Sequence, residues 1–115
     1  HSTDFVGTAD ELAVQTARMI RLLAIEGLSF GQIAAKLPAA RRTIERRFIA
    51  AFGRTPHEAL LDVRLDRAKR LLAESTLSLD RIAEQCGFGS AKYFGAAFRR
   101  AVGVPPRTYR SQATG

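Results

Sequence analysis

The sequence of 115 residues predicts an all-α protein of about seven helices, arranged as two helix-turn-helix subdomains joined by a long linker helix. Three observations support this fold class. Apolar residues recur every three or four positions, without the alternation typical of strands. Capping residues, glycines and prolines separate the apolar stretches. The pattern of the first half also recurs about 50 residues later.

Three helices are predicted in the first half of the chain. Thr8 begins a capping box, and the helix that follows it is expected over residues 9–26. Ser29 begins a second capping box, for a short helix that Pro38 ends. A helix of about 13 residues then runs to Phe52.

The longest helix is predicted over residues 56–74, with Pro56 at its first position. Spacing assigns its apolar stripe to Leu61, Leu65, Ala68 and Leu72. Basic residues, among them Arg64, are expected to cover much of the remaining surface. Three shorter helices follow, which begin near Ser78, Ser90 and Pro105.

An internal repeat organises these elements. Ser29, Ile33 and Ala34 recur as Ser78, Ile82 and Ala83, and Ile44, Phe48, Gly53 and Pro56 recur as Phe94, Phe98, Gly103 and Pro106. Each copy is a short helix, a turn and a second helix, which is a helix-turn-helix unit. The predicted organisation is a cloning remnant or linker over residues 1–7, a first subdomain over 8–55, the linker helix over 56–74 and a second subdomain over 75–115.

Charge and composition narrow the classes of function. The net charge is +7, and residues 28–115 hold 16 basic against seven acidic side chains, which favours a polyanionic partner. One cysteine and two histidines are too few for a structural zinc site, so no metal or cofactor is expected. The chain shows no glycine-rich phosphate loop and no nucleophilic triad, so it is not expected to be an enzyme. No apolar run is long enough to span a membrane, and the expected location is the cytoplasm.

The second helix of the first copy carries the predicted chemistry. With Ile44 and Phe48 in the core, helical spacing turns a basic face outward, and we expect this face to bind DNA. Its predicted DNA-binding residues are Arg41, Arg42, Glu45 and Arg46. Arginine donates two hydrogen bonds to guanine, and glutamate accepts from cytosine N4 in the major groove. The alternative is a solvated helix with a single Arg–Glu pair.

The second copy offers fewer groups that could read bases. Its predicted DNA-binding residues are Ser90, Ala91, Lys92, Gly95 and Ala96. Only Lys92 has a long donor, the alanines suit a thymine methyl, and Gly95 allows close backbone approach. This unit is therefore expected to contribute mainly phosphate contacts and fit. Because the linker helix is about 28 Å long and successive major-groove segments lie about 34 Å apart, one monomer is expected to dock both units.

From Leu28 to Arg110 the chain resembles the DNA-binding domain of the AraC/XylS family of bacterial transcription regulators. The resembling segments are Arg42-x-Ile44-x-Arg46-x-Phe48, Gly53-Arg-Thr-Pro56, Arg64-Leu-Asp-Arg-Ala68, Tyr93-Phe94-x-x-x-Phe98 and Gly103-Val-Pro-Pro106. The resemblance implies base contacts from the positions of Arg42, Glu45, Arg46, Ala91, Lys92 and Ala96. It also implies regulation of promoters, with double-stranded DNA and RNA polymerase as partners. Residues 45–48 and 53–56 particularly resemble the xylose-regulator subset, in which a sugar-sensing domain precedes this one.

The sequence departs from the family pattern at three positions. Pro38 stands where the second copy has its turn glycine, so the first turn must take another route. Ala40 replaces the usual capping serine of the first reading helix. Ala96 replaces an arginine, which weakens the expected base reading by the second unit. Cys86 aligns with Leu37 and is expected to be a small buried core residue.

Two hypotheses about function follow. The leading one is sequence-specific binding of double-stranded DNA by two major-groove recognition helices, which regulates transcription from bacterial promoters. The alternative is a helical protein-interaction module whose basic face docks an acidic partner such as RNA polymerase.

Overall fold

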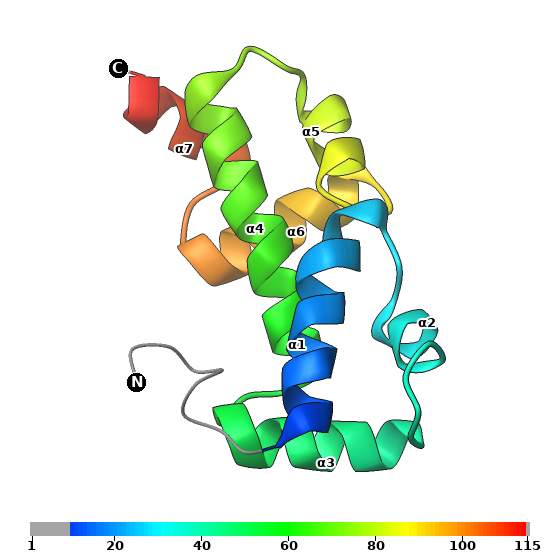
Figure 1. Cartoon of the computed structure of the whole chain (residues 1–115). Coiled ribbons are helices and arrows are strands. Elements are labelled where there is room, and N and C mark those ends of the chain that lie inside the picture. The colour runs from blue at the N-terminus through cyan, green and yellow to red at the C-terminus, as the bar shows by residue number, and fades with distance from the viewer. Residues whose placement is uncertain (1–9, 115) are drawn as a thin grey trace. The chain divides into compact units, whose positions relative to one another are not determined.

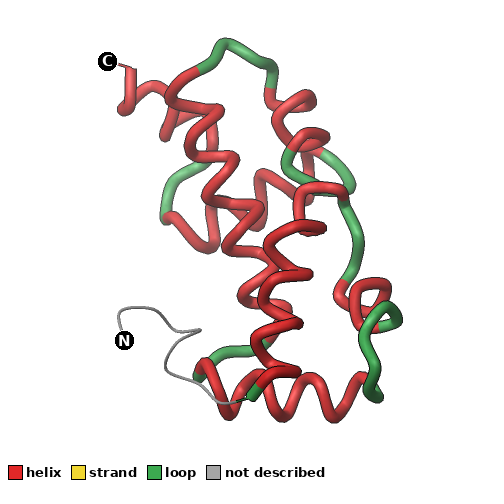
Figure 2. Tube along the Cα trace, in the orientation of Figure 1, coloured by secondary structure: helices red, strands yellow, loops and turns green. Residues whose placement is uncertain are grey.

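The computed structural model describes residues 10–114, and within them it forms seven α-helices, one short 3-10 helix and no strand (Figures 1 and 2). The predicted all-α class with about seven helices is confirmed. The helices are α1 (Glu11–Leu23), η1 (Ala24–Glu26), α2 (Phe30–Ala34), α3 (Arg41–Phe52), α4 (Pro56–Glu74), α5 (Leu79–Gln85), α6 (Ala91–Val102) and α7 (Pro106–Thr114).

The first compact unit comprises residues 10–24 and Leu28–Asp62. Here α1 contacts both α2 and α3, and the N-terminal end of α1 meets α3 (Figure 1). Its core is almost fully excluded from solvent and is built from Ala13, Ile20, Ile33, Ile44, Phe48 and Leu60. Helix α2 starts at a complete capping box in which Ser29 and Gln32 each bond the other's backbone N–H. The second predicted capping box is thus confirmed.

The second unit comprises Ile25–Gly27 and residues 63–114. Helix α6 contacts α5 and α7, and its Phe94 and Phe98 are completely buried. The Phe98 ring meets Tyr109 of α7 edge to face at 5.4 Å. Arg110 donates hydrogen bonds to the carbonyl oxygens of Leu72 and Ser75, which ties α7 to the end of α4.

The internal repeat is present in the packing of the two units. Both members of each matched pair are buried: Ile33 and Ile82, Ala34 and Ala83, Ile44 and Phe94, Phe48 and Phe98, and Pro56 and Pro106. Both α3 and α6 end at a glycine with left-handed backbone, Gly53 with φ 74° and Gly103 with φ 97°. Glycine adopts this conformation without the steric cost that a Cβ imposes. Each unit therefore has a second helix of 12 residues that ends at a glycine, although the N-caps differ, Ala40 in the first unit and Ser90 in the second.

The linker helix differs from its prediction in its buried face. Leu65, Ala68 and Leu72 are buried as expected, but Leu61 is half-buried and its neighbour Leu60 is 1% exposed. Arg64 was expected on the surface, yet it is 6% exposed. The reason is that α4 also buries residues at a spacing of four, beginning with Leu60 and Arg64. Because Arg64 is charged, a search for apolar periodicity does not detect this buried face.

Helix α1 is shorter than the predicted helix over 9–26. Asp10 is its N-cap, with the carboxylate accepting from the Ala13 N–H at 3.1 Å, and the last turn tightens into η1. The predictions for Thr8 and for residues 1–7 concern positions outside the described residues. The division into subdomains at 55/56 and 74/75 stays a prediction, because α4 is continuous and contributes residues to both units.

The turn between α2 and α3 differs from its counterpart between α5 and α6. Gly87 has φ 89°, whereas the first turn uses no residue of positive φ. The departure expected from Pro38 is confirmed, and α2 already ends at Ala34, before that proline. The turn before α3 therefore has a different backbone conformation from the turn before α6.

Candidate nucleic-acid interface

Helix α3 is anchored by two apolar side chains on one face. Ile44 is 1% exposed and Phe48 2% exposed, and the Phe48 ring packs on Phe52 with centroids 4.8 Å apart. Arg42 and Arg46 lie on the opposite side of the helix and are exposed. Within the described residues neither of these two arginines forms an ion pair. Their guanidinium groups are therefore available to an acceptor outside the domain.

Arg41 and Glu45, also predicted to bind DNA, contact one another. The Arg41 Nε lies 3.3 Å from Glu45 Oε2, and the two side chains remain 61% and 42% exposed. The Arg41 guanidinium also lies over the Phe30 ring of α2, 5.4 Å from its centroid. Because a carboxylate has about four acceptor sites, this pair leaves Glu45 with unused acceptor capacity. The Arg–Glu pair of the solvated-helix alternative is thus present, but it occupies only one flank of the helix.

Arg47 points in a different direction from the predicted site. It donates two hydrogen bonds to the Asp10 carboxylate, at 2.9 Å and 3.0 Å, and so joins α3 to the N-terminus of α1. This pairing, together with the Ala13 N–H, lowers the pKa of Asp10 and raises that of Arg47. Arg47 therefore orients α3 within the first unit.

Helix α6 repeats this arrangement with less basic side chains. The Ser90 hydroxyl caps the helix by accepting from the Tyr93 N–H at 3.0 Å. Lys92 and Ala96 are exposed, whereas Ala91 and Gly95 are half-buried. A Cβ added at Gly95 would meet nothing within 4 Å, so packing inside this unit does not require glycine there. The five predicted residues lie on one helix and its cap, next to the exposed Arg99 and Arg100.

Two exposed side chains on the recognition helices were missed by the sequence analysis. Ile49 of α3 and Tyr93 of α6 are each 44% exposed. Tyr93 packs edge-on against Phe88, with ring centroids 5.7 Å apart. The spacing of Ile49 from Arg42 and Arg46 could have placed it on the same helical face.

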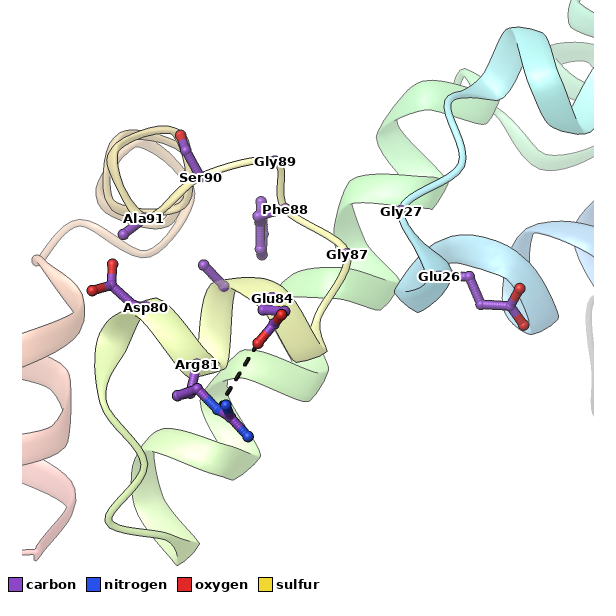
Figure 3. A pocket seen from close by; sticks show the side chains of 11 residues that line it. Glu26, Gly27, Asp80, Arg81, Glu84, Gly87, Phe88, Gly89, Ser90 and Ala91 are labelled. Carbon is purple, nitrogen blue, oxygen red and sulfur yellow. Dashed lines mark ion pairs between the residues drawn. The ribbon is translucent and has the colours of Figure 1, made fainter.

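The second unit also contains an open groove of about 620 Å³ beside the start of α6 (Figure 3). Its acidic lining residues are Glu26, Asp80 and Glu84. Arg81 is 3.9 Å from Glu84, and the Ser90 side chain points away from that glutamate (Figure 3). Ser90 and Ala91, which are predicted to bind DNA, line the same groove together with these carboxylates and Arg81.

The described residues contain no group of three potential metal ligands. Over the same range, no helix has the length and apolar character needed to cross a lipid bilayer. Burial raises the pKa of the Cys86 thiol to about 11, and the side chain is completely enclosed, as predicted for a core residue.

Two helix-turn-helix units that each present an exposed second helix, the first of them rich in arginine, define the architecture of a DNA-binding protein. Known proteins support this class. A family described as "Helix-turn-helix domain" matches residues 33–112. The xylose operon regulatory protein of Escherichia coli (strain K12) is 32% identical over 95% of this chain, which spans 28% of that protein.

Two solved structures are similar as well. The DNA-binding domain of AdpA, a global transcriptional factor in complex with a target DNA, is 35% identical with a TM-score of 0.77, over 90% of this chain and 93% of that one. The xylose-binding transcription activator xylR is 30% identical with a TM-score of 0.75, over 94% of this chain and 28% of that one.

The chain belongs to the AraC-type helix-turn-helix family of DNA-binding domains. The resemblance drawn from the sequence is thereby confirmed, as is the function it implied, sequence-specific DNA binding in transcription regulation. The family is one of DNA-binding regulators, which are in general not enzymes.

Proposed function

We propose that α3 is the principal base-reading helix and that Arg42 and Arg46 each donate to a guanine in the major groove. The observation that carries this assignment is their exposure, without an ion pair among the described residues, on the face opposite buried Ile44 and Phe48. A guanidinium that is already solvated and unpaired can turn to the O6 and N7 atoms of guanine without breaking an internal contact.

Arg41 and Glu45 act as a coupled pair in this proposal. Glu45 Oε2 and the Phe30 ring hold Arg41 at the first position of α3. A helix N-terminus with an oriented arginine suits a phosphate oxygen, so Arg41 binds the DNA backbone. The remaining lone pairs of Glu45 accept from a cytosine amino group beside the guanines.

In this proposal the second unit contributes shape complementarity to the DNA more than base reading. Lys92 supplies one donor, Ala91 and Ala96 offer methyl groups to thymine, and the open space at Gly95 allows the backbone to approach. Ser90 begins this surface while its hydroxyl caps α6. A binding site with two blocks about one helical turn apart would follow if both units dock on one DNA molecule.

The chain spans 28% of the length of the xylose operon regulatory proteins that it matches, so the activity of the whole protein is also a proposal. We propose that a sensor domain accompanies this one, that a sugar is its ligand and that the bound protein contacts RNA polymerase. This assignment rests on the similarity to a regulator and a structure named for xylose. We also propose that the protein acts at bacterial promoters in the cytoplasm and has no enzymatic activity of its own.

Selection of binding sites from a random duplex pool tests the assignment. Arg42→Ala and Arg46→Ala should each relax the preference at one base pair and weaken binding to the selected site by about 5- to 150-fold. Arg18→Ala, which removes an exposed arginine from α1, is the matched control and should keep the same consensus. If Arg42→Ala and Arg46→Ala both select and bind the wild-type site as the control does, the assignment is wrong. Binding to an acidic protein without any selected consensus would favour the interaction-module alternative.

A further inference from the structure

An exposed apolar residue lies on the same side of α3 as the proposed base-reading arginines. Three large apolar or aromatic side chains are notably exposed within residues 10–114: Leu22, Ile49 and Tyr93. Tyr93 is partly explained by its contact with Phe88, and Leu22 lies on α1. Ile49 is 44% exposed and belongs to the helix that carries the proposed base-reading arginines.

The position of Ile49 on the helix follows from the 3.6-residue period. Ile49 lies about 20° around the helix from Arg42 and about 60° from Arg46, whereas the buried Ile44 and Phe48 lie about 140° and about 100° away from it. These three residues, Arg42, Arg46 and Ile49, form one outward row along α3, which we call the reading row. Isoleucine is thus the apolar member of a row whose other members are arginines.

Folding of the first unit does not explain an isoleucine at this position. Ile49 keeps 44% of its surface exposed and lies outside the buried core around Ile44 and Phe48, so a large part of its apolar surface stays in water. A β-branched residue is also a poorer helix former than arginine, and Arg99 occupies the equivalent position in the second copy, where it is exposed. The isoleucine is therefore better suited to an apolar partner outside the domain than to the domain itself.

We propose that Ile49 is a further specificity-determining residue, which contacts the C5 methyl group of a thymine in the major groove. This inference rests on the proposed function of α3. The thymine methyl is the apolar group that the major groove displays, and apolar side chains recognise it there. Ile49 lies about 4.5 Å along the helix axis from Arg46, and base pairs are stacked about 3.4 Å apart. The thymine is therefore expected one or two base pairs from the guanine that Arg46 reads.

Replacing single thymines by uracil tests this contact, because uracil lacks only the methyl group. The probe is the duplex selected by the wild-type chain, with each thymine of the first block changed in turn. Wild type should lose about fourfold in affinity at one position, the factor expected for one buried carbon group. Ile49→Ala should bind the unmodified duplex about fourfold or more weakly and should not respond to uracil at that position.

Leu22→Ala is the matched control, since it truncates a side chain that is 68% exposed on α1. It should retain both the wild-type affinity and the sensitivity to uracil, and thermal melting should show that all variants are folded. The proposal is overturned if Ile49→Ala binds as wild type does, or if it weakens binding but keeps the wild-type response to uracil. If Arg46→Ala still relaxes specificity in either case, only this inference fails. If Arg46→Ala has no effect either, the proposed function fails with it.

Discussion

Replacing Ala40 by serine should stabilise the first helix-turn-helix unit. Ala40 is the N-cap of α3 and makes no side-chain hydrogen bond. Its backbone, with φ −67° and ψ 148°, matches the capping serines Ser29 (φ −72°, ψ 163°) and Ser78 (φ −66°, ψ 160°). Each of those hydroxyls accepts from a backbone N–H three residues later at 3.2 Å. In Ala40→Ser the new hydroxyl would accept from the Thr43 N–H without a change of backbone.

The magnitude follows from the cost of an absent N-cap. A serine cap is worth about 1 kcal/mol over alanine, with a range of roughly 0.5–2 kcal/mol. A gain of this size would shift the folding equilibrium of the unit about fivefold and raise its melting temperature by several degrees. The reverse change in the second copy, Ser90→Ala, should cost a similar amount, because it removes the acceptor for the Tyr93 N–H.

Urea denaturation of the two variants measures both effects, and amide hydrogen exchange at Thr43 reports the new cap locally. Ala40→Ser should move the urea midpoint upward at an unchanged slope, and the Thr43 amide should become more protected. The reasoning is refuted if Ser90→Ala is destabilised while Ala40→Ser changes neither the midpoint nor the exchange of that amide. That outcome would show that α3 needs no side-chain cap.

Two further predictions concern titratable groups. The pKa of Asp10 lies below its ordinary value of 3.8, mainly because Arg47 donates hydrogen bonds to its carboxylate. The ionised Asp10 side chain therefore contributes its full stabilisation above pH 3.8, and this stabilisation is lost as the pH falls through the folded-state pKa. In urea denaturation between pH 5 and 2, the stability advantage of wild type over Asp10→Asn should vanish toward the acid end. Because Cys86 is enclosed and has a pKa of about 11, a thiol reagent at pH 8 should label it slowly in buffer and rapidly in denaturant.

The sequence predicted burial correctly at positions where apolar residues are buried and charged residues are exposed. Ile44, Phe48, Phe94 and Phe98 were placed in the core by their spacing, and they are buried. The same spacing turned Arg42 and Arg46 outward, and they are exposed. Periodicity works here because α3 and α6 each bury a single narrow face.

Apolar periodicity did not predict burial where a helix packs on more than one side or where a charged residue is buried. Leu60 and Arg64 belong to a buried line of α4 that a search for apolar residues alone does not find. Arg41 lies over the Phe30 ring of α2, and no sequence pattern could have shown that contact. Contacts between residues from different helices depend on tertiary geometry, which local spacing does not contain.

The direct test of the central claim is a cycle between Arg46→Ala and a modified guanine. Replacing guanine by 7-deazaguanine removes the N7 acceptor that an arginine would contact but keeps base pairing. The modification is placed at each guanine of the selected site in turn, and the affinities of wild type and Arg46→Ala are compared by fluorescence anisotropy at one salt concentration. Wild type should lose affinity at one guanine to which Arg46→Ala is indifferent. An equal loss for both proteins at every guanine would contradict base reading by Arg46.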